Sequence, residues 1–256
     1  MELTTILGII VGILAVVVAM IFKHISFAAF SNPAALTIIF AGTIACVLNA
    51  FTGHEIKNIG KLFKILFTKY DTSRKSKLID TICEFAQSAR KEGLLSLENK
   101  VEALEDEFLK RGVRMVVDSA SEDYIRDVLS IEMEQIKERH GMNAGIFSQA
   151  GMYAPTLGVL GAVFGLIAAM GSINDTAAMS EAIAAAFMAT ILGIFTGYVL
   201  WNPFANKLKL KDKHEMVEKR IILEGVLSIL NGDHPDMIKD KLRSFLTAKE
   251  KTSTGE

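Results

Sequence analysis

The sequence predicts an all-α polytopic membrane protein with four transmembrane helices and a helical cytoplasmic domain. Half of the 256 residues are hydrophobic, and four long stretches contain no Asp, Glu, Lys or Arg. At about 1.5 Å of rise per residue, each stretch can cross or nearly cross a hydrocarbon layer of about 30 Å. The stretches are Leu3–Phe22, Ala34–Phe51, Met152–Met170 and Ala182–Trp201.

These spans divide the chain into four segments. Residues 1–51 hold the first two spans, and residues 52–145 form the first half of the cytoplasmic domain. Residues 146–203 hold the last two spans, and residues 204–256 form the C-terminal cytoplasmic part. The first stretch is 20 residues long and follows no basic segment, so we expect an uncleaved span rather than a signal peptide.

The distribution of basic residues predicts the orientation of the spans. Residues 52–145 contain 16 Lys and Arg, and six more lie between positions 207 and 220. The link from Gly171 to Glu181 has none, and the first hairpin has only Lys23. Because basic loops stay in the cytoplasm, we expect both termini and the long central segment on that side.

Composition and motifs exclude several classes of function. The 16 basic residues of the central segment face 17 acidic ones, whereas nucleic-acid binding needs a net basic surface. Cys46 and Cys83 favour neither a disulfide nor a metal site, and the five histidines lack ligand spacing. No motif of a nucleotide-binding loop or of a hydrolase is found. We therefore expect no catalytic residue, no cofactor and no metal.

The cytoplasmic segments have the periodicity of several helices. The first, Ile56–Phe67, places apolar residues opposite Lys57, Lys61 and Lys64, as in a helix that lies along the inner membrane surface. The others are predicted from Thr72 to Gly93, from Ser96 to Gly112, from Ser121 to Arg139, from the fourth span to Asn231, and after Pro235.

Arg90 and Glu98 lie on either side of the turn predicted at Gly93. A cation in the last turn of a helix and an anion in the first turn of the next both complement the helix dipole. Alternatively, the tip of this helix–turn–helix presents opposite charges to a protein partner. Spacing alone does not decide between these interpretations.

The spans are rich in small residues at helical spacing. Gly8/Gly12, Gly161/Gly165 and Gly193/Gly197 each form G-x-x-x-G, which favours dense helix packing or assembly. Pro155 either lies in a first helical turn or kinks a helix that begins earlier. Pro203 is expected to stop or bend the fourth span.

The absence of charge within the spans bears on function. Ionisable groups inside a membrane are costly and usually mark ion pathways. Either the protein moves no ions, or a partner supplies the titrating group. Thr190, in the middle of the fourth span, bonds its own backbone or lines a polar path beside another subunit's acid.

The whole chain resembles the A subunit of the bacterial flagellar motor stator, the MotA/PomA family. Two spans, a cytoplasmic region of about a hundred residues, two further spans and a charged tail match that layout. The local matches are Asn32-Pro33 before Ala41-Gly42-Thr43, the stretch from Ala89 to Glu98, Pro155-Thr156-Leu157-Gly158 with Gly161 and Gly165, Ala189-Thr190, and Asn202-Pro203.

The resemblance implies a pentamer of this chain in the bacterial cytoplasmic membrane, around the membrane helices of two B subunits. The B subunit would carry the intramembrane aspartate and a peptidoglycan anchor. Arg90 and Glu98 match the charges that engage the rotor switch protein. Pro155 and Pro203 match prolines that couple ion flow to movement, and Thr190 matches the threonine of the ion path.

The resemblance also suggests which ion is transported. Sodium-type relatives have a threonine hydroxyl at the position of Ala162, and a methyl group offers sodium no oxygen ligand. We therefore expect protons rather than sodium ions.

Three rival interpretations remain. An ExbB/TolQ-like energiser usually has one span before its cytoplasmic region, whereas this chain has two. A self-contained small transporter would need polar or broken helices in its own spans. A purely structural scaffold leaves the charged cytoplasmic region without a task.

Overall fold

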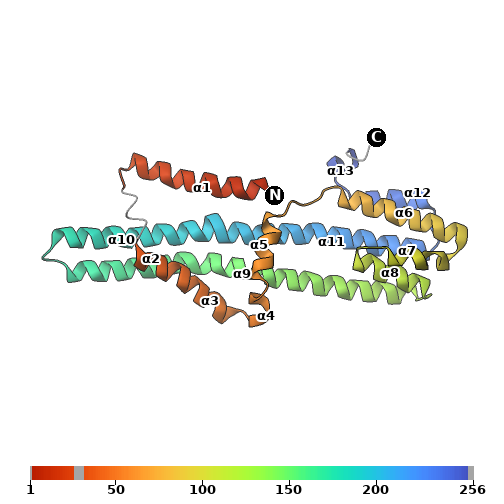
Figure 1. Ribbon diagram of the computed structural model, residues 1–256, viewed down its shortest axis with the longest axis horizontal. Helices are drawn as coiled ribbons and strands as arrows, with labels where there is room; N and C mark the ends of the chain where they lie inside the picture. Colours follow the sequence, from red (N-terminus) through yellow and green to blue (C-terminus); the bar gives the residue numbers. More distant parts are fainter. Residues whose placement is uncertain (1, 26–31, 253–256) are drawn as a thin grey trace. The chain divides into compact units, whose positions relative to one another are not determined.

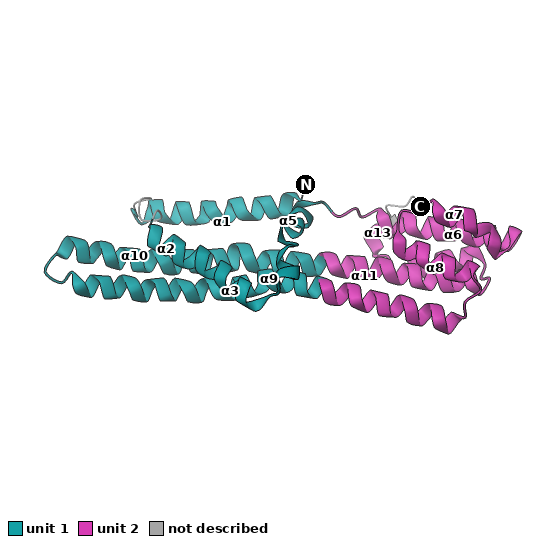
Figure 2. Ribbon diagram, turned by 60° about the horizontal axis from the view of Figure 1, so that its bottom comes forward, with its two compact units in different colours: residues 1–69, 140–210 teal, residues 70–139, 211–256 magenta. Residues whose placement is uncertain are grey.

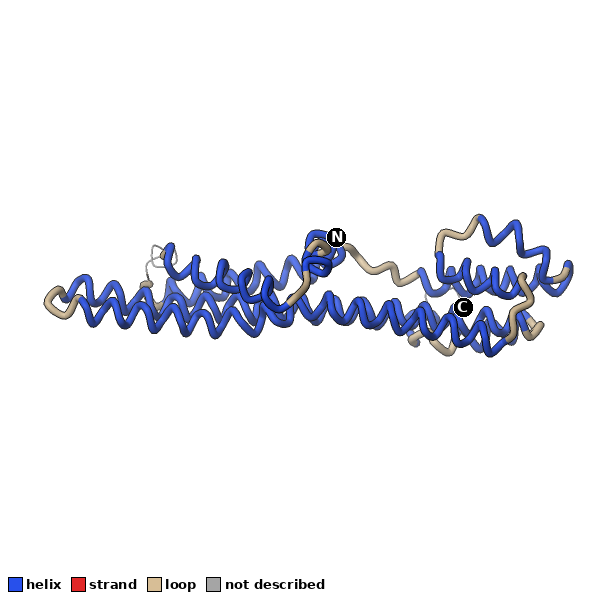
Figure 3. Tube along the Cα trace, turned by 90° about the horizontal axis from the view of Figure 1, so that it is seen from below, coloured by secondary structure: helices blue, strands red, loops and turns tan. Residues whose placement is uncertain are grey.

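The computed structural model describes residues 2–25 and 32–252, and every regular element in this part is a helix (Figure 3). The chain forms two compact units (Figure 2). Unit 1 contains residues 1–69 and 140–210, and unit 2 contains residues 70–139 and 211–256. The segments expected from sequence end instead at positions 51, 145 and 203, so the chain just after the second span belongs to unit 1.

The described residues include four helices long and apolar enough to cross a membrane, as predicted (Figure 1). The first is α1 (Leu3–Phe22), and the third lies in α9 (Glu122–Gly171). The second runs through α2 (Pro33–Leu36), the π-helical η2 (Thr37–Ala41) and α3 (Gly42–Ala50). The fourth runs through α10 (Thr176–Phe195), the π-helical η4 (Thr196–Trp201) and α11 (Asn202–Leu230).

The second span begins at an Asn-Pro pair. The Asn32 side chain accepts hydrogen bonds from the backbone N–H groups of Ala34 (3.0 Å) and Ala35 (3.2 Å). Pro33 occupies the first helical position, where its missing N–H costs nothing. These two residues fix where the helix starts.

The predicted amphipathic segment forms two short helices, α4 (Gly53–Ile56) and α5 (Ile59–Phe67). Leu62 and Leu66 are buried, whereas the lysines of the opposite face are exposed. The Phe63 ring meets Phe147 of α9 edge to face, with centroids 5.3 Å apart. The apolar face therefore attaches α5 to the membrane helices of unit 1.

The sequence prediction separated a helix ending at Arg139 from the third span, and this separation is wrong. The 50 residues of α9 form one helix that passes through Gly141 and Gly145. A glycine costs a helix about 1 kcal/mol relative to alanine. Ala144, Ile146 and Phe147 are buried in a common apolar cluster, and their packing offsets that cost.

Besides Leu97, Val101 and Leu246, five helices contribute the apolar side chains that form the core of unit 2. They are α6 (Arg74–Glu92), α8 (Glu107–Val117), α12 (Pro235–Arg243) and the parts of α9 and α11 that belong to this unit. Ile82, Val113 and Ile221 are fully buried there. The short α13 (Ala248–Thr252) is joined to α6 by the pair of Lys75 and Glu250, with Nζ 2.9 Å from Oε1.

The helix predicted from Ser96 to Gly112 is interrupted. A 3₁₀ turn, η3 (Leu94–Leu97), leads into α7 (Glu98–Glu102), and α8 begins after Asp106. Asp106 caps α8 by accepting hydrogen bonds from the N–H groups of Phe108 and Leu109. Gly112 ends no helix but lies inside α8. A Cβ there would lie 2.9 Å from the Val226 side chain of α11, and this close contact explains the glycine.

Candidate functional site

The contact between α9 and α10 is built from glycines. A Cβ on Gly193 would lie 2.6 Å from the Ala154 carbonyl oxygen and 2.8 Å from the Gly158 Cα. Farther along, a Cβ on Gly165 would lie 2.9 Å from the Ala186 Cα. Two backbones approach at both levels, and a backbone cannot move aside as a side chain can. The predicted dense packing is confirmed for this pair of helices.

Pro155 lies inside α9, so the interpretation as a first-turn proline is wrong. A proline has no N–H to donate, and the carbonyl of Gly151 four residues earlier loses its helical partner. Gly197 of η4 lies against this region: a Cβ there would be 2.8 Å from the Gly151 oxygen and 2.8 Å from the Pro155 Cγ. The proline and the freed carbonyl therefore face the fourth span.

Thr190 is half-buried on α10, and its hydroxyl donates to the Ala186 carbonyl of its own helix at 3.4 Å. Its Cα lies 3.3 Å from where a Gly158 Cβ would be. Ala162 is half-buried on α9, one turn after Gly158. Thr190 thus lies in the α9–α10 contact, and Pro155 lies against η4, which continues the same span. Ala162 adds no polar group there.

Pro203 was expected to stop or bend the fourth span, and the structure contradicts the stop. The helix continues into α11, and the six preceding residues form the π-helical η4. The backbone N–H of Asn202 donates to the Gly197 carbonyl, and the Thr196 hydroxyl donates to the carbonyl of Leu192 at 2.8 Å. Because Pro203 has no backbone N–H to donate, the regular α-helical hydrogen bonds are interrupted here, and the wider π turn accommodates the interruption. Such π segments often occur at functional sites.

The Glu181 carboxylate lies within the helix that contains the fourth span, whereas the sequence placed it in the preceding link. The fourth span was expected from Ala182, but α10 begins at Thr176, where the Asp175 side chain caps its first N–H groups. Glu181 is therefore helical and lines a cavity of about 370 Å³ with Asn32. The N-cap at Asp175 was the signal that could have placed it. The stretch after Glu181 remains free of charge.

Arg90 and Glu98 flank an exposed turn of unit 2. Arg90 lies in the last turn of α6, and Glu98 is the first residue of α7. Between them Gly93 has a φ of +84°, a conformation that favours glycine. Both charged side chains are exposed, and within the described part of the chain neither forms an ion pair. Leu95, between them, is 73% exposed.

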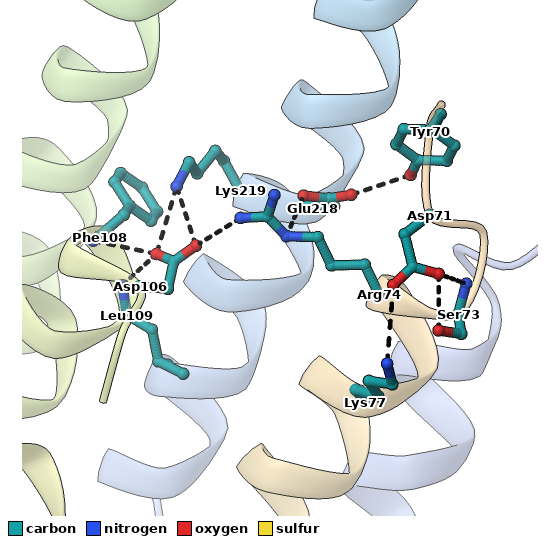
Figure 4. Close-up of polar contacts among 10 residues, drawn as sticks. All are labelled: Tyr70, Asp71, Ser73, Arg74, Lys77, Asp106, Phe108, Leu109, Glu218 and Lys219. Carbon is teal, nitrogen blue, oxygen red and sulfur yellow. Dashed lines mark hydrogen bonds and ion pairs between the residues drawn. The ribbon is translucent and has the colours of Figure 1, made fainter. Parts of the chain in front are cut away.

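The other end of α6 is held by a polar cluster that sequence reasoning missed (Figure 4). We call Tyr70, Arg74, Asp106, Glu218 and Lys219 the α6 base cluster. The Tyr70 hydroxyl donates to Glu218 at 2.9 Å, and Arg74 Nε lies 3.2 Å from the same carboxylate. Arg74 Nη2 and Lys219 Nζ each lie 3.3 Å from Asp106. Residues from three separate segments meet here, so no local sequence spacing could predict the cluster.

Burial and charge set the pKa values of this cluster. Burial raises the pKa of Glu218 above its ordinary value, and the contacts with Tyr70 and Arg74 only partly oppose that effect. Burial also acts to raise the pKa of Asp106, but Lys219, the backbone N–H of Leu109 and Arg74 outweigh it and lower the pKa. Burial, together with the neighbouring Glu218 carboxylate, raises the pKa of Tyr70.

Among residues 2–25 and 32–252, no three His, Cys, Asp or Glu side chains come close enough together to hold a metal ion. The predicted site residues fall into two places. Pro155, Ala162, Thr190 and Pro203 lie on the membrane helices of unit 1, and Arg90 and Glu98 lie on the exposed turn of unit 2.

The chain is similar to known proteins over nearly its whole length. A family model described as the MotA/TolQ/ExbB proton channel family matches residues 100–221. Over 256 residues the chain is 50% identical to motility protein A of Bacillus subtilis (strain 168), covering 100% of this chain and 95% of the relative. Over 246 residues it is 31% identical to chemotaxis protein PomA of Vibrio alginolyticus, covering 96% of both.

Two solved structures are similar along nearly the whole chain. One is the flagellar MotAB stator complex from Bacillus subtilis, with a TM-score of 0.91, 50% identity and coverage of 98% of both chains. The other is C. jejuni MotAB, with a TM-score of 0.90, 31% identity and coverage of 97% of both.

Proposed function

Since the chain belongs to the motility protein A (MotA/PomA) type within the MotA/TolQ/ExbB proton channel family, we propose that it is the A subunit of a bacterial flagellar stator. With a B subunit it forms a proton-driven channel complex that generates torque on the rotor switch protein. Its similarity to chains of two MotAB complexes supports the B-subunit partner. The observation that carries the proposal is the set of four long apolar stretches that contain no Asp, Glu, Lys or Arg.

The complex lies in the bacterial cytoplasmic membrane, and this chain is its pentameric component. Both termini and unit 2 face the cytoplasm, because the basic residues gather at those ends of the spans. The helices α4 and α5 lie along the inner surface, with Lys57, Lys61 and Lys64 toward the headgroups.

The ion is a proton rather than sodium. Ala162 supplies a methyl group where a sodium path would need an oxygen ligand. A proton relayed to a carboxylate of the B subunit needs no cage of ligands.

In this mechanism, the loss of a charge on the B subunit changes how helices pack. A proton neutralises the B-subunit aspartate, and the loss of that charge changes how the B helix packs against α9 and α10. Pro155, with the freed Gly151 carbonyl beside Gly197, is the place where α9 can yield. The exposed turn at Arg90 and Glu98 then acts on the rotor. Each proton contributes about 2.3 kcal/mol per 100 mV of membrane potential.

Charge reversal at the exposed turn tests the rotor contact. We expect Arg90→Glu and Glu98→Lys each to reduce swimming speed strongly while the stator still reaches the membrane, because rim charges set encounter and register. Matched controls are Lys239→Glu and Asp240→Lys, which reverse exposed charges on α12. Unchanged torque in both tip variants, measured on tethered cells, would remove these residues from the rotor role.

The rival functions have less support. An ExbB/TolQ-like energiser shares the family model, but the two spans before unit 2 follow the layout of the motility proteins. A small transporter with its own pathway lacks the polar span residues that it would need.

A further inference from the structure

A cavity of about 260 Å³ lies in unit 1 among α3, α4, α5, α9 and η4. Its walls are apolar side chains with a single hydroxyl, that of Thr43. The lining residues are Phe40, Thr43, Ile44, Val47, Leu48, Ile56, Ile59, Phe63, Ile146, Phe147, Ala150 and Trp201. None of the residues proposed for the ion path or the rotor contact belongs to it, so the proposed function leaves this cavity unexplained.

The cavity opens on the outer face of the second span. Phe40, Ile44 and Leu48 follow one another at intervals of four residues and are 41%, 60% and 55% exposed. These side chains form the rim, whereas Val47 and Ala150 form part of the buried wall. On the single chain this rim is exposed within a membrane span, so hydrocarbon chains can reach it.

The Thr43 hydroxyl is an independent sign of a ligand. Thr43 is 5% exposed, and in the described residues its Oγ1 is the buried side-chain oxygen or nitrogen without a hydrogen-bond partner. Buried hydroxyls are almost always satisfied, and an exception calls for an unseen partner. A molecule with both an apolar chain and an oxygen acceptor would supply one.

Charge identifies the kind of molecule. Ile56 and Ile59 line the cavity. Lys57 directly follows α4, and Lys61 lies on α5. Both lysines are exposed, and within the described part of the chain neither forms an ion pair. Lysines at the end of a span reach the headgroup layer, where they attract anionic lipids.

We propose that this cavity binds one acyl chain of an anionic phospholipid from the cytoplasmic leaflet, with the phosphate on Lys57 and Lys61. The Thr43 hydroxyl donates to an ester oxygen of the same lipid. The assignment of the leaflet rests on the proposed orientation, and the binding chemistry does not. The lipid would fasten α5 to the second span without taking part in ion transfer.

Trp201 provides the measurement, because it is the single tryptophan of the chain and it lines the cavity. The full-length chain is reconstituted in vesicles with phospholipids whose acyl chains carry bromine, which quenches tryptophan on contact. We expect brominated phosphatidylglycerol to reach half-maximal quenching at about a tenfold lower mole fraction than brominated phosphatidylcholine.

Matched variants separate the parts of the site. Lys57→Gln with Lys61→Gln should abolish the preference for phosphatidylglycerol, whereas Lys209→Gln with Lys213→Gln removes the same charge elsewhere and should keep it. Leu48→Phe should narrow the rim and weaken quenching by both lipids. Leu14→Phe is its control, because Leu14 is 53% exposed on α1 and does not line the cavity.

Equal quenching by the two lipids in the wild-type chain would show bulk lipid only and would overturn the proposal. Absence of quenching by either lipid would show that another protein segment covers the cavity, which overturns it as well. A preference that survives the double variant at Lys57 and Lys61 would remove the headgroup assignment. The readout needs neither torque nor a B subunit, so its failure would leave the proposed stator function standing.

Discussion

At the scale of single residues, the contact of α9 with α10 depends on glycines, which have no side chain to keep the two backbones apart. Gly158 and Gly193 face each other, and Gly197 lies on the carbonyl of Gly151. At these positions one added methyl group meets a backbone atom of the opposite helix. Steric fit, more than any single polar bond, therefore decides how the third and fourth spans pack.

Gly193→Ala tests this steric limit. The new methyl would lie 2.6 Å from the Ala154 oxygen, so we expect a loss of about 1–3 kcal/mol of stability and impaired motility. Thermal unfolding of the solubilised complex measures the first effect, and swimming assays measure the second. Gly8→Ala is the control, because no atom lies within 4 Å of a Cβ there. Equal effects of the two substitutions would contradict the argument.

The α6 base cluster predicts two opposite pH dependences. The raised pKa of Glu218 gives stability that is fully present below its ordinary value of 4.5 and is lost as pH rises through the folded-state pKa. The lowered pKa of Asp106 gives stability that is present above its ordinary value of 3.8 and is lost as pH falls through the folded-state pKa.

Unfolding of the full chain between pH 3 and pH 8 measures both effects. The stability difference between wild type and Glu218→Gln should shrink as pH rises, whereas the difference between wild type and Asp106→Asn should shrink as pH falls. Two differences that change in the same direction would refute the assignment of the two carboxyl groups.

At the scale of elements, the sequence predicts most of what local signals encode. Charge-free length located all four spans, and Gly93 located the end of α6. The sequence did not predict the continuity of α9 through its glycines, because tertiary packing offsets their cost. The π turns were also missed, since an apolar run reads the same in either kind of helix. The α6 base cluster was missed because it depends on contacts between residues far apart in sequence.

Pro155→Ala tests whether the proline that destabilises α9 is needed for torque. A proline inside a helix costs about 3 kcal/mol, so its removal should raise the unfolding temperature of the complex. The regained hydrogen bond to Gly151 should also stiffen α9, and torque on tethered cells should fall. A variant that is less stable than wild type, or one with full torque, would count against Pro155 as the yielding point of α9.

At the scale of the whole molecule, the membrane helices and the exposed turn that we propose for the rotor contact belong to different units of one chain. Each unit has its own buried cluster, and the residues of the two candidate sites are not mixed between them. Such a division suits a subunit that receives an ion-driven change at one place and delivers it at another. In the proposed function, a second protein supplies the ion-binding group.

Liposomes test this division of labour. Vesicles that hold only the purified chain should keep an imposed pH gradient, because its four apolar stretches contain no Asp, Glu, Lys or Arg. Vesicles with an active B subunit should lose the gradient, and replacement of the B-subunit aspartate by asparagine should stop the loss. A pH-sensitive dye follows all three preparations, and rapid dissipation by the chain alone would refute the proposed function.

The π turns of the second and fourth spans have a consequence for sequence length. Each π hydrogen bond closes a ring one residue larger than an α-helical bond does. A homologue that lacks one residue between positions 196 and 201 could close the same turn as ordinary α-helix. Single-residue gaps in this protein's evolutionary history should therefore gather at these two turns, where a deletion need not rotate the helix that follows.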